Sequence, residues 1–361
     1  MSTTARRQAV GERAQATPVL ELTGGSVSYA AGGPLTVADV SFGLYPGEIL
    51  GLVGESGCAK STTARALLGL VPLVAGQIKL RGEAMSGRDP RLRAAVQAIF
   101  QNPAASFNPK RSLLDSVSEP LRVRGVRDRG DRRRRALAEL DRVGITAATA
   151  ERRPQEVSGG QCQRAAIARA TVVRPAALIC DEPVSALDVS IQAQILELLA
   201  ELRAEHGLAM LFISHDLSVV AALCDRTAVM YGGRMVETGG AVRIADDPRH
   251  PYSVILTDSA PELTVTDRRP PRLLPLQPAD EIDVRALPGC PYVPYCPRAD
   301  ELCAGMPALA GLPGLPEGNL VACHHPYRPG TPAGAASFAD RPGDTRGEPL
   351  GGVAGGPALE Q

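Results

Sequence analysis

Residues 49–62 read ILGLVGESGCAKST, and this stretch decides the fold. The apolar run Ile49 to Val53 leads directly into a glycine loop at Gly54, and from Thr62 to Leu70 the composition is that of a helix. An unbroken apolar run before a glycine loop is typical of a buried parallel strand. Because such a loop and the following helix point backbone N–H groups at one place, the stretch predicts a polyphosphate site.

Within this loop, Lys60 has the position of a side chain that neutralises phosphate oxygens, and Ser61 that of a hydroxyl ligand of Mg²⁺. Ala59 departs from the G-x-x-x-x-G-K-[ST] pattern, because it stands where the pattern has its last glycine. A methyl group there costs on the order of 1 kcal/mol in backbone strain. Either the loop tolerates alanine after a small shift or the site is degenerate, and both interpretations stay open. The residues expected around the phosphates are Gly54, Ser56, Gly57, Cys58, Ala59, Lys60, Ser61 and Thr62.

Two further stretches carry polar groups to places where ligands bind. Asp181 and Glu182 directly follow the apolar run Ala177 to Cys180, at the predicted carboxyl edge of a parallel sheet. The alternative interpretation is a helix N-cap before Pro183. Residues 158–161, Ser-Gly-Gly-Gln, open a helix-like segment and so predict a second N-terminus suited to an anion, with Ser158 able to bond a phosphate oxygen.

The order of the elements predicts an α/β fold with a mostly parallel sheet. Strands are expected at Val19 to Tyr29, Leu35 to Leu44, Val96 to Phe100 and Ala209 to Ser214, and a helix at Ile191 to His206. Between Pro103 and Ala170 the character is helical and rich in arginine, which predicts a helical insertion.

Composition sets the outer limits. The chain has 361 residues, 44% of them apolar, and 39 charges of each sign, so no overall attraction to nucleic acid or anionic lipid is expected. The arginine run at 131–135 is interpreted as a solvated helix face, because few aromatic residues accompany it. No apolar run reaches about 18 residues and none resembles a signal peptide, so the chain is expected in the cytosol. Segments 1–17 and 328–361 have too few large apolar residues to fold and are expected to be disordered.

Together, the motifs of the chain resemble those of the ATPase subunit of an ABC transporter. Further landmarks, among them Gln101-Asn102-Pro103, Pro154-Gln155-Glu156 and His250-Pro251-Tyr252, make the resemblance closest to the oligopeptide/dipeptide and nickel import branch. It implies a RecA-like P-loop NTPase core, an antiparallel β subdomain and an inserted helical subdomain at about 103–170. The ATPase domain would span 18–262, and 263–327 would form a Pro-rich linker and a small extension that contains cysteines.

The resemblance also implies roles for individual residues. Asp181 would hold Mg²⁺, and Glu182 would act as general base on the attacking water. Gln101 would sense Mg²⁺ and couple to a transmembrane subunit through the loop at 102–109, and His215 would contact the γ-phosphate. Tyr29 matches the aromatic residue that stacks on adenine, with a core tyrosine as the alternative. Residues expected in nucleotide binding across a head-to-tail dimer, or beside the site, are Ser158, Gly159, Gly160, Gln161 and Asp188.

Four of the eight cysteines gather late in the chain, at Cys290, Cys296, Cys303 and Cys323. Their C-x5-C-x6-C-x19-C spacing is a weak zinc signal, and four thiolates suit zinc or a [4Fe–4S] cluster equally well. The resemblance favours the iron–sulfur cluster, with zinc and no metal as alternatives. The other four, Cys58, Cys162, Cys180 and Cys224, are expected to pack in the core as small apolar residues.

The predicted function is that of a subunit that binds and hydrolyses ATP with Mg²⁺ to power uptake of peptides or similar solutes. Its implied partners are a second ABC ATPase subunit, two transmembrane permease subunits and an extracytoplasmic solute-binding protein, which places it at the cytoplasmic face of the membrane. Two alternatives stay open. One is a degenerate subunit paired with a competent ATPase, and the other is a soluble ABC ATPase acting on nucleic acid or ribosomes.

Overall fold

The computed structural model describes residues 17–30, 32–185, 187–258 and 283–327. The expected disordered segments at 1–17, apart from Thr17, and at 328–361 therefore lie outside the described residues. The same holds for most of the Pro-rich linker.

An eight-stranded mixed sheet forms the centre of the molecule, in the strand order β11-β12-β10-β9-β3-β8-β7-β6. The five strands from β9 to β6 are parallel to one another, and β10, β12 and β11 extend the sheet with antiparallel pairs. These strands are β3 (Ile49–Val53), β6 (Val96–Ile99), β7 (Ala177–Asp181), β8 (Ala209–Ser214), β9 (Arg226–Tyr231), β10 (Arg234–Gly240), β11 (Ala310–Gly311) and β12 (Leu320–Val321). The predicted α/β class with a mostly parallel core is confirmed.

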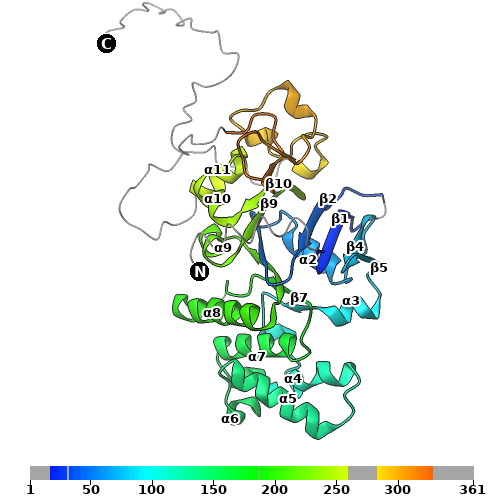
Figure 1. Cartoon of the computed structure of the whole chain (residues 1–361), viewed down its shortest axis with the longest axis vertical. Helices are drawn as coiled ribbons and strands as arrows, with labels where there is room; N and C mark the ends of the chain where they lie inside the picture. The colour runs from blue at the N-terminus through cyan, green and yellow to red at the C-terminus, as the bar shows by residue number, and fades with distance from the viewer. Residues whose placement is uncertain (1–16, 31, 186, 259–282, 328–361) are drawn as a thin grey trace, which may run out of the picture.

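A second sheet is antiparallel and has four strands, in the order β2-β1-β4-β5. Its strands are β1 (Leu20–Val27), β2 (Val37–Leu44), β4 (Ala75–Leu80) and β5 (Glu83–Met85). It stands beside the central sheet in Figure 1. The prediction that the first strand reaches Tyr29 is wrong, because the strand ends at Val27 and the chain then turns into an exposed loop.

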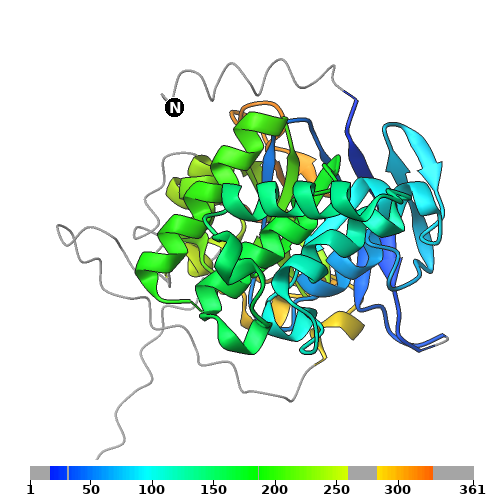
Figure 2. The same ribbon diagram turned by 90° about the horizontal axis from the view of Figure 1, so that it is seen from below.

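Four helices form a lobe at the end of the molecule opposite the cysteine-containing segment (Figure 1). They are α4 (Leu113–Val123), α5 (Arg129–Arg142), α6 (Ala147–Ala150) and α7 (Gly159–Thr171). Seen from that end, the lobe lies in front of the central sheet (Figure 2). Helical structure was expected from Pro103 onward, but the first α-helix of this lobe, α4, begins at Leu113. Residues 104–112 hold only a 3₁₀ turn, and Ser112 then caps α4.

The arginine run lies on α5, where Arg133, Arg134 and Arg135 are exposed and Arg132 is partly exposed. Arg134 pairs with Asp131 at 2.5 Å, and Arg133 pairs with Glu151 at 2.5 Å. Both pairs are open to solvent, as expected for a solvated helix face.

The remaining helices connect or flank the strands. They are α2 (Lys60–Leu67), α3 (Pro90–Ala95), α8 (Val189–His206), α9 (Leu217–Leu223), α10 (Ala241–Asp246) and α11 (Pro251–Asp258), with 3₁₀ turns at Ala104–Ser106, Pro154–Glu156, Val284–Ala286, Val293–Tyr295 and Glu301–Ala304. Among the described residues, no helix combines the length and the apolar character needed to cross a membrane.

A buried carboxylate on β10 ties the sheet to the segment that follows it. Glu237 has no exposed surface, and its oxygens accept from Arg243 Nη1 at 2.5 Å. The same carboxylate accepts from the backbone N–H groups of Arg249 and His250, at 3.0 and 2.9 Å. A buried carboxylate is stable only when such partners compensate for its lost hydration. Glu237 therefore fixes the start of α11 against the sheet.

We expect Glu237→Ala to lower the free energy of unfolding by about 3 kcal/mol or more, because it leaves two buried backbone N–H groups without their acceptor and removes the carboxylate that pairs with Arg243. Urea unfolding followed by circular dichroism measures this. Glu237→Gln is the matched control and should cost less, because its amide oxygen still accepts hydrogen bonds. A loss below about 1 kcal/mol in Glu237→Ala would show that the carboxylate is not a structural anchor.

Candidate functional site

The glycine loop connects β3 to α2, as predicted, and its backbone needs unusual conformations. Gly54 has φ 155° and Gly57 has φ 83°, values that favour glycine. A Cβ atom on Gly54 would lie 2.2 Å from the Met230 carbonyl oxygen on the neighbouring strand β9. Only glycine therefore fits at the point where the chain leaves the sheet.

Lys60 is buried and lies across the loop. Its ammonium donates to the carbonyl oxygens of Gly54 and Glu55, at 2.6 and 2.9 Å. The Cys58 thiol lies 3.7 Å from the same ammonium, and burial raises the pKa of that thiol, which keeps it neutral. The loop thus holds one cation at its centre through two neutral carbonyl oxygens.

Ala59 adopts the left-handed conformation that the pattern reserves for glycine, with φ 81° and ψ 21°. This conformation costs a residue with a Cβ atom roughly 1–2 kcal/mol. The residue is only 8% exposed and belongs to an apolar cluster with Ala64 and Leu67. The methyl group is therefore accommodated within the protein, which favours the interpretation that the loop tolerates alanine.

Asp181 ends strand β7 and faces the loop. Its Oδ1 accepts a hydrogen bond from the Ser61 hydroxyl at 3.0 Å. Burial raises the pKa of Asp181, and the Ser61 hydrogen bond opposes this effect. The alternative of a helix N-cap before Pro183 is wrong, because the next helix, α8, begins at Val189. A hydroxyl and a carboxylate at this separation are a suitable pair of oxygen ligands for Mg²⁺.

Glu182, Gln101 and His215 come together from the ends of three adjacent strands. Gln101 Nε2 donates to Glu182 Oε2 at 2.9 Å, and His215 Nδ1 lies 3.5 Å from Glu182 Oε1. Glu182 has φ 47°, and a non-glycine residue in this region stores strain of the kind found at functional sites. A carboxylate oriented by an amide and an imidazole can accept a proton from an attacking water.

These groups line one open groove. Ser56 of the loop, Gln101, Glu182 and His215 contribute to its wall, and so does Gly159 at the start of α7. Gln163, which the sequence analysis missed, lies in the same wall. Its signal was available, because Gln163 follows Gly159 by four residues on α7 and so lies on the same helix face.

The predicted second helix N-terminus is confirmed. Ser158 caps α7: its Oγ accepts from the Gln161 N–H at 3.2 Å, and Gln161 Oε1 accepts from the Ser158 N–H at 3.1 Å. Within the part of the chain that the structure describes, no hydrogen bond joins residues 158–161 to the glycine loop. Asp188 stands at the N-cap of α8 without a side-chain capping bond.

Tyr29 is 61% exposed, so the alternative of a core tyrosine is wrong. Its hydroxyl lies 3.2 Å from Thr62 Oγ1 on α2. An exposed aromatic ring beside the glycine loop is available for stacking on a flat ligand.

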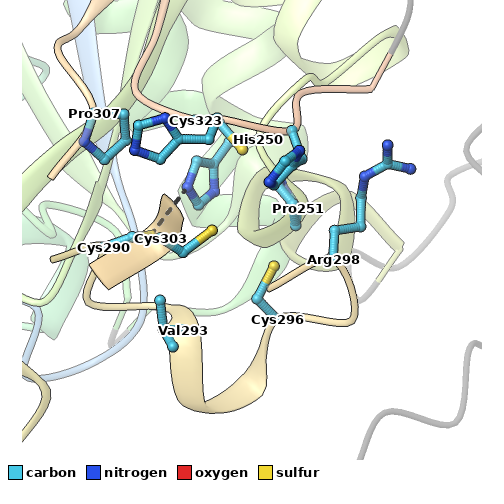
Figure 3. Close-up of a pocket in the computed structure, with 11 residues that line it drawn as sticks. His250, Pro251, Cys290, Val293, Cys296, Arg298, Cys303, Pro307 and Cys323 are labelled. Atoms are coloured by element: carbon cyan, nitrogen blue, oxygen red, sulfur yellow. Dashed lines mark hydrogen bonds between the residues drawn. The ribbon is translucent and has the colours of Figure 1, made fainter. Parts of the chain in front are cut away.

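The four late cysteines line one cavity, the cysteine cavity, together with His250, Arg298, His324 and His325 (Figure 3). Figure 3 shows Cys296, Cys303 and Cys323 with their thiols toward a common space. The sequence analysis did not predict the histidines, although His324 and His325 directly follow Cys323. The other four cysteines, Cys58, Cys162, Cys180 and Cys224, are free and buried, as expected.

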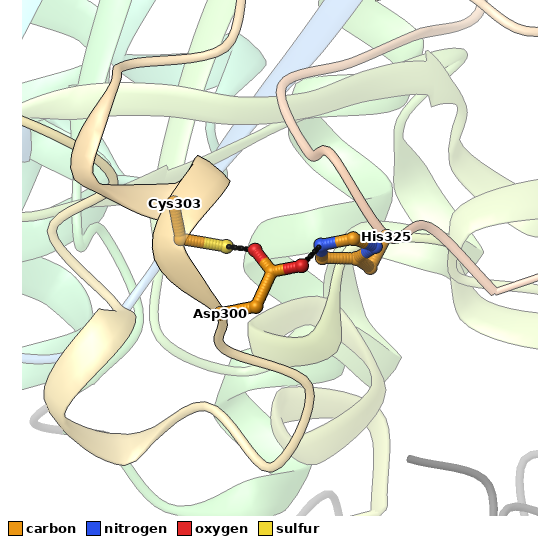
Figure 4. Close-up of side chains that lie close together, drawn as sticks. All are labelled: Asp300, Cys303 and His325. Carbon is orange, nitrogen blue, oxygen red and sulfur yellow. Dashed lines mark hydrogen bonds and ion pairs between the residues drawn. The ribbon is translucent and has the colours of Figure 1, made fainter. Parts of the chain in front are cut away.

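Burial raises the pKa of each thiol in the cysteine cavity, that of Cys296 to about 11 and that of Cys323 to about 12. A cation is needed to hold several of them as thiolates. Asp300 accepts from Cys303 Sγ at 3.6 Å and pairs with His325 Nε2 at 2.8 Å (Figure 4). The hydrogen bond with His325 holds the pKa of Asp300 below its usual value.

Comparison with known protein families gives two matches. Residues 37–185 match the model of the ABC transporter family. Residues 236–303 match the model described as the C-terminal region of oligopeptide/dipeptide transporters.

Individual relatives cover most of the chain. A putative peptide import ATP-binding protein of Brucella abortus is 42% identical over 296 residues, which is 80% of this chain and 86% of that protein. The oligopeptide transport ATP-binding protein OppF of Haemophilus influenzae is 42% identical over 74% of this chain and 82% of its own length. The solved structure of CbiO1 from Clostridium perfringens, part of an ABC transporter complex, has a TM-score of 0.58 at 26% identity, over 63% of this chain and 90% of its own.

We expect Ala59→Gly to change the dissociation constant of ATP·Mg²⁺ by less than about twofold, because the methyl group is buried in the apolar cluster. Lys60→Ala should raise the same constant at least about tenfold, because it removes a charged hydrogen-bond donor. Titration of the purified chain with a fluorescent ATP analogue measures both. The opposite pattern, strong tightening in Ala59→Gly and little effect of Lys60→Ala, would establish the degenerate site.

Proposed function

Because this chain belongs to the ATP-binding subunits of ABC transporters, in the oligopeptide/dipeptide import family, we propose that it binds and hydrolyses ATP to power uptake of peptides or similar small solutes. One observation supports the assignment of ATP hydrolysis to particular residues. Glu182 is held by Gln101 and His215 beside the Ser61–Asp181 pair, at the mouth of the glycine loop.

Each residue then has a chemical task. Lys60 and the loop N–H groups bind the phosphates. Ser61, Asp181 and Gln101 would hold Mg²⁺, whose charge would stabilise the phosphates in the transition state. Glu182 takes the proton of the water that attacks the γ-phosphate, and His215 contacts the γ-phosphate from the neighbouring strand. Tyr29 stacks on the adenine ring. Placement supplies most of the rate, since little covalent chemistry is left to the protein.

We expect a second ATPase subunit to complete the transporter. The capped N-terminus of α7, residues 158–161, is available to phosphates of an opposing subunit, which supports a head-to-tail dimer with a second copy or a related chain. A solved structure similar to this chain, the ATP-binding cassette MJ0796 in a post-hydrolysis state with ADP and Pi, is a dimer; its TM-score is 0.56 at 26% identity, over 62% of this chain and 98% of its own.

The other partners are membrane subunits. The loop at 102–109 is joined to α7 by Arg169, which donates to the Ser106 carbonyl oxygen at 2.5 Å and lies over the Phe107 ring. This link supports a role for the loop in coupling to a transmembrane permease pair at the cytoplasmic face of the membrane. An extracytoplasmic binding protein would deliver the solute.

The chemistry of the donor set in the cysteine cavity supports a [4Fe–4S] cluster. Four cysteines, Cys290, Cys296, Cys303 and Cys323, line the cavity and would hold it. A cluster would supply cation charge that the raised pKa values of these thiols require. Asp300, Cys303 and His325 form a competing ligand set for zinc, since their ligand atoms lie within 4.8 Å of one another.

Glu182→Gln should abolish steady-state ATP hydrolysis while leaving ATP binding intact, because it removes the base and keeps the phosphate loop unchanged. Gel filtration with ATP should show a stabilised dimer. Glu197→Gln, an exposed neutralisation on α8, is the matched control and should hydrolyse ATP normally. Unchanged hydrolysis in Glu182→Gln would remove Glu182 from its proposed role.

Protein purified without oxygen should contain iron and acid-labile sulfide in equal amounts, about four of each per chain for a [4Fe–4S] cluster. Both should fall together in Cys296→Ser and Cys303→Ser, and Cys162→Ser on α7 is the control that should retain them. Zinc without sulfide, lost in His325→Ala, would point to the Asp300 set instead. Metal-free protein with an unchanged melting temperature would end the metal proposal.

A further inference from the structure

One hydrogen bond joins the glycine loop to a distant part of the chain. The Tyr252 hydroxyl on α11 accepts from the Glu55 backbone N–H at 2.8 Å, across 197 residues of sequence. Glu55 directly follows Gly54, where the chain leaves β3 and enters the loop. Tyr252 is fully buried, and burial raises the pKa of its phenol, so it stays a neutral acceptor at this N–H.

Glu55 is held at both ends of its backbone. Its N–H is bound by Tyr252, from outside the loop, and its carbonyl oxygen accepts from Lys60 at 2.9 Å, from inside the loop. Lys60 is the residue that must also serve phosphate oxygens. Tyr252 is therefore one anchor of Glu55 that does not depend on the ligand or on Lys60.

Tyr252 is itself fixed by its surroundings. Its backbone N–H donates to His250 Nδ1 at 3.1 Å, and the His250 N–H donates to the buried carboxylate of Glu237. Both hydrogen bonds act on the backbone at the start of α11 and fix the position from which the Tyr252 side chain extends.

Two other tyrosines pack around the ring and form, with Tyr252, the tyrosine cluster. Tyr231 on β9 has its ring centre 4.5 Å from that of Tyr252, and Tyr292 lies 5.5 Å from Tyr252 and 5.2 Å from Tyr231. Tyr292 lies two residues after Cys290, which lines the cysteine cavity. Through Tyr292, the cysteine-containing segment therefore packs against Tyr252, which in turn binds the glycine loop.

We propose that Tyr252 is a positioning residue for ATP binding: its hydroxyl fixes Glu55 at the entry of the glycine loop, and Tyr292 braces the phenol from the cysteine-containing segment. This inference rests on the proposed function, since it concerns the same nucleotide site. It makes the segment at 283–327 a contributor to ATP affinity, although the cysteine cavity and the groove share no lining residue.

The first test is Tyr252→Phe, which removes the hydroxyl and keeps the ring. We expect the dissociation constant of ATP·Mg²⁺ to rise about fivefold, the effect of one net hydrogen bond, and the KM for ATP of the transporter complex to rise with kcat changed less than twofold. The melting temperature should stay within about 4 °C of the wild type. Tyr231→Phe is the matched control, because its hydroxyl makes no hydrogen bond to the loop in the described part of the chain.

The second test is a double-mutant cycle between Tyr252→Phe and Tyr292→Leu. Tyr292→Leu alone should weaken ATP binding at least about twofold, and it should add nothing in the Tyr252→Phe background, because the brace acts through the hydroxyl. Independent, additive effects would overturn the brace. A lowered melting temperature with unchanged affinity in Tyr252→Phe would overturn the positioning role and leave a structural one.

Different results would overturn the proposed function and the role of Tyr252. Wild-type protein that does not bind ATP would overturn the proposed function itself. Wild-type protein that binds ATP, with Tyr252→Phe binding equally well, would overturn only the role of Tyr252.

Discussion

The site depends on the parallel pairing of β3, β8, β7 and β6. Parallel strands in register end at the same edge, so the residues that follow them must meet there. Val53 is paired with Ser214, Asp181 with Ile213, and Ile99 with Cys180. The glycine loop, both carboxylates, Gln101 and His215 therefore come together through backbone hydrogen bonding before any side chain contributes. A shift of one residue in any of these pairs would turn the proposed catalytic groups to the wrong face.

Two of the five non-glycine residues with positive φ in the described part of the chain lie at this edge of the sheet. Both Ala59 and Glu182 have positive φ without being glycine, and both stand directly beside the groups that would meet the phosphates. Such conformations persist only where the surroundings determine them fully. At Ala59 the surroundings are the apolar cluster below the loop, and at Glu182 they are the hydrogen bonds from Gln101 and from its own N–H to Ile213. Packing and hydrogen bonding around the sheet thus offset the free-energy cost of these two backbone conformations.

The cysteine-containing segment is built into the fold. Strand β12 pairs with β10 and extends the central sheet, and the buried carboxylate of Glu237 lies on that same strand β10. A chain of hydrogen bonds runs from Glu237 on β10 through His250 and Tyr252 to the backbone of the glycine loop. Packing and hydrogen bonding join the two regions, because a segment as short as 283–327 cannot form a core of its own.

The sequence by itself determined the local units and their chemistry. The strand at Ile49–Val53, the strand at Ala209–Ser214 and the capped helix after Ser158 were predictable, because apolar runs, glycines and capping residues act over a few residues. Strands β4, β5, β9 and β10 were not predicted. The β9–β10 hairpin did carry a local signal that was missed, because Gly232-Gly233 forms a two-residue turn directly after the apolar run Ala228 to Tyr231. Only the tertiary structure decided that Tyr29 is exposed, that the late cysteines share one cavity and that Tyr252 holds Glu55. Those contacts join residues far apart in the chain, and strand order and packing, which no local pattern encodes, bring them together.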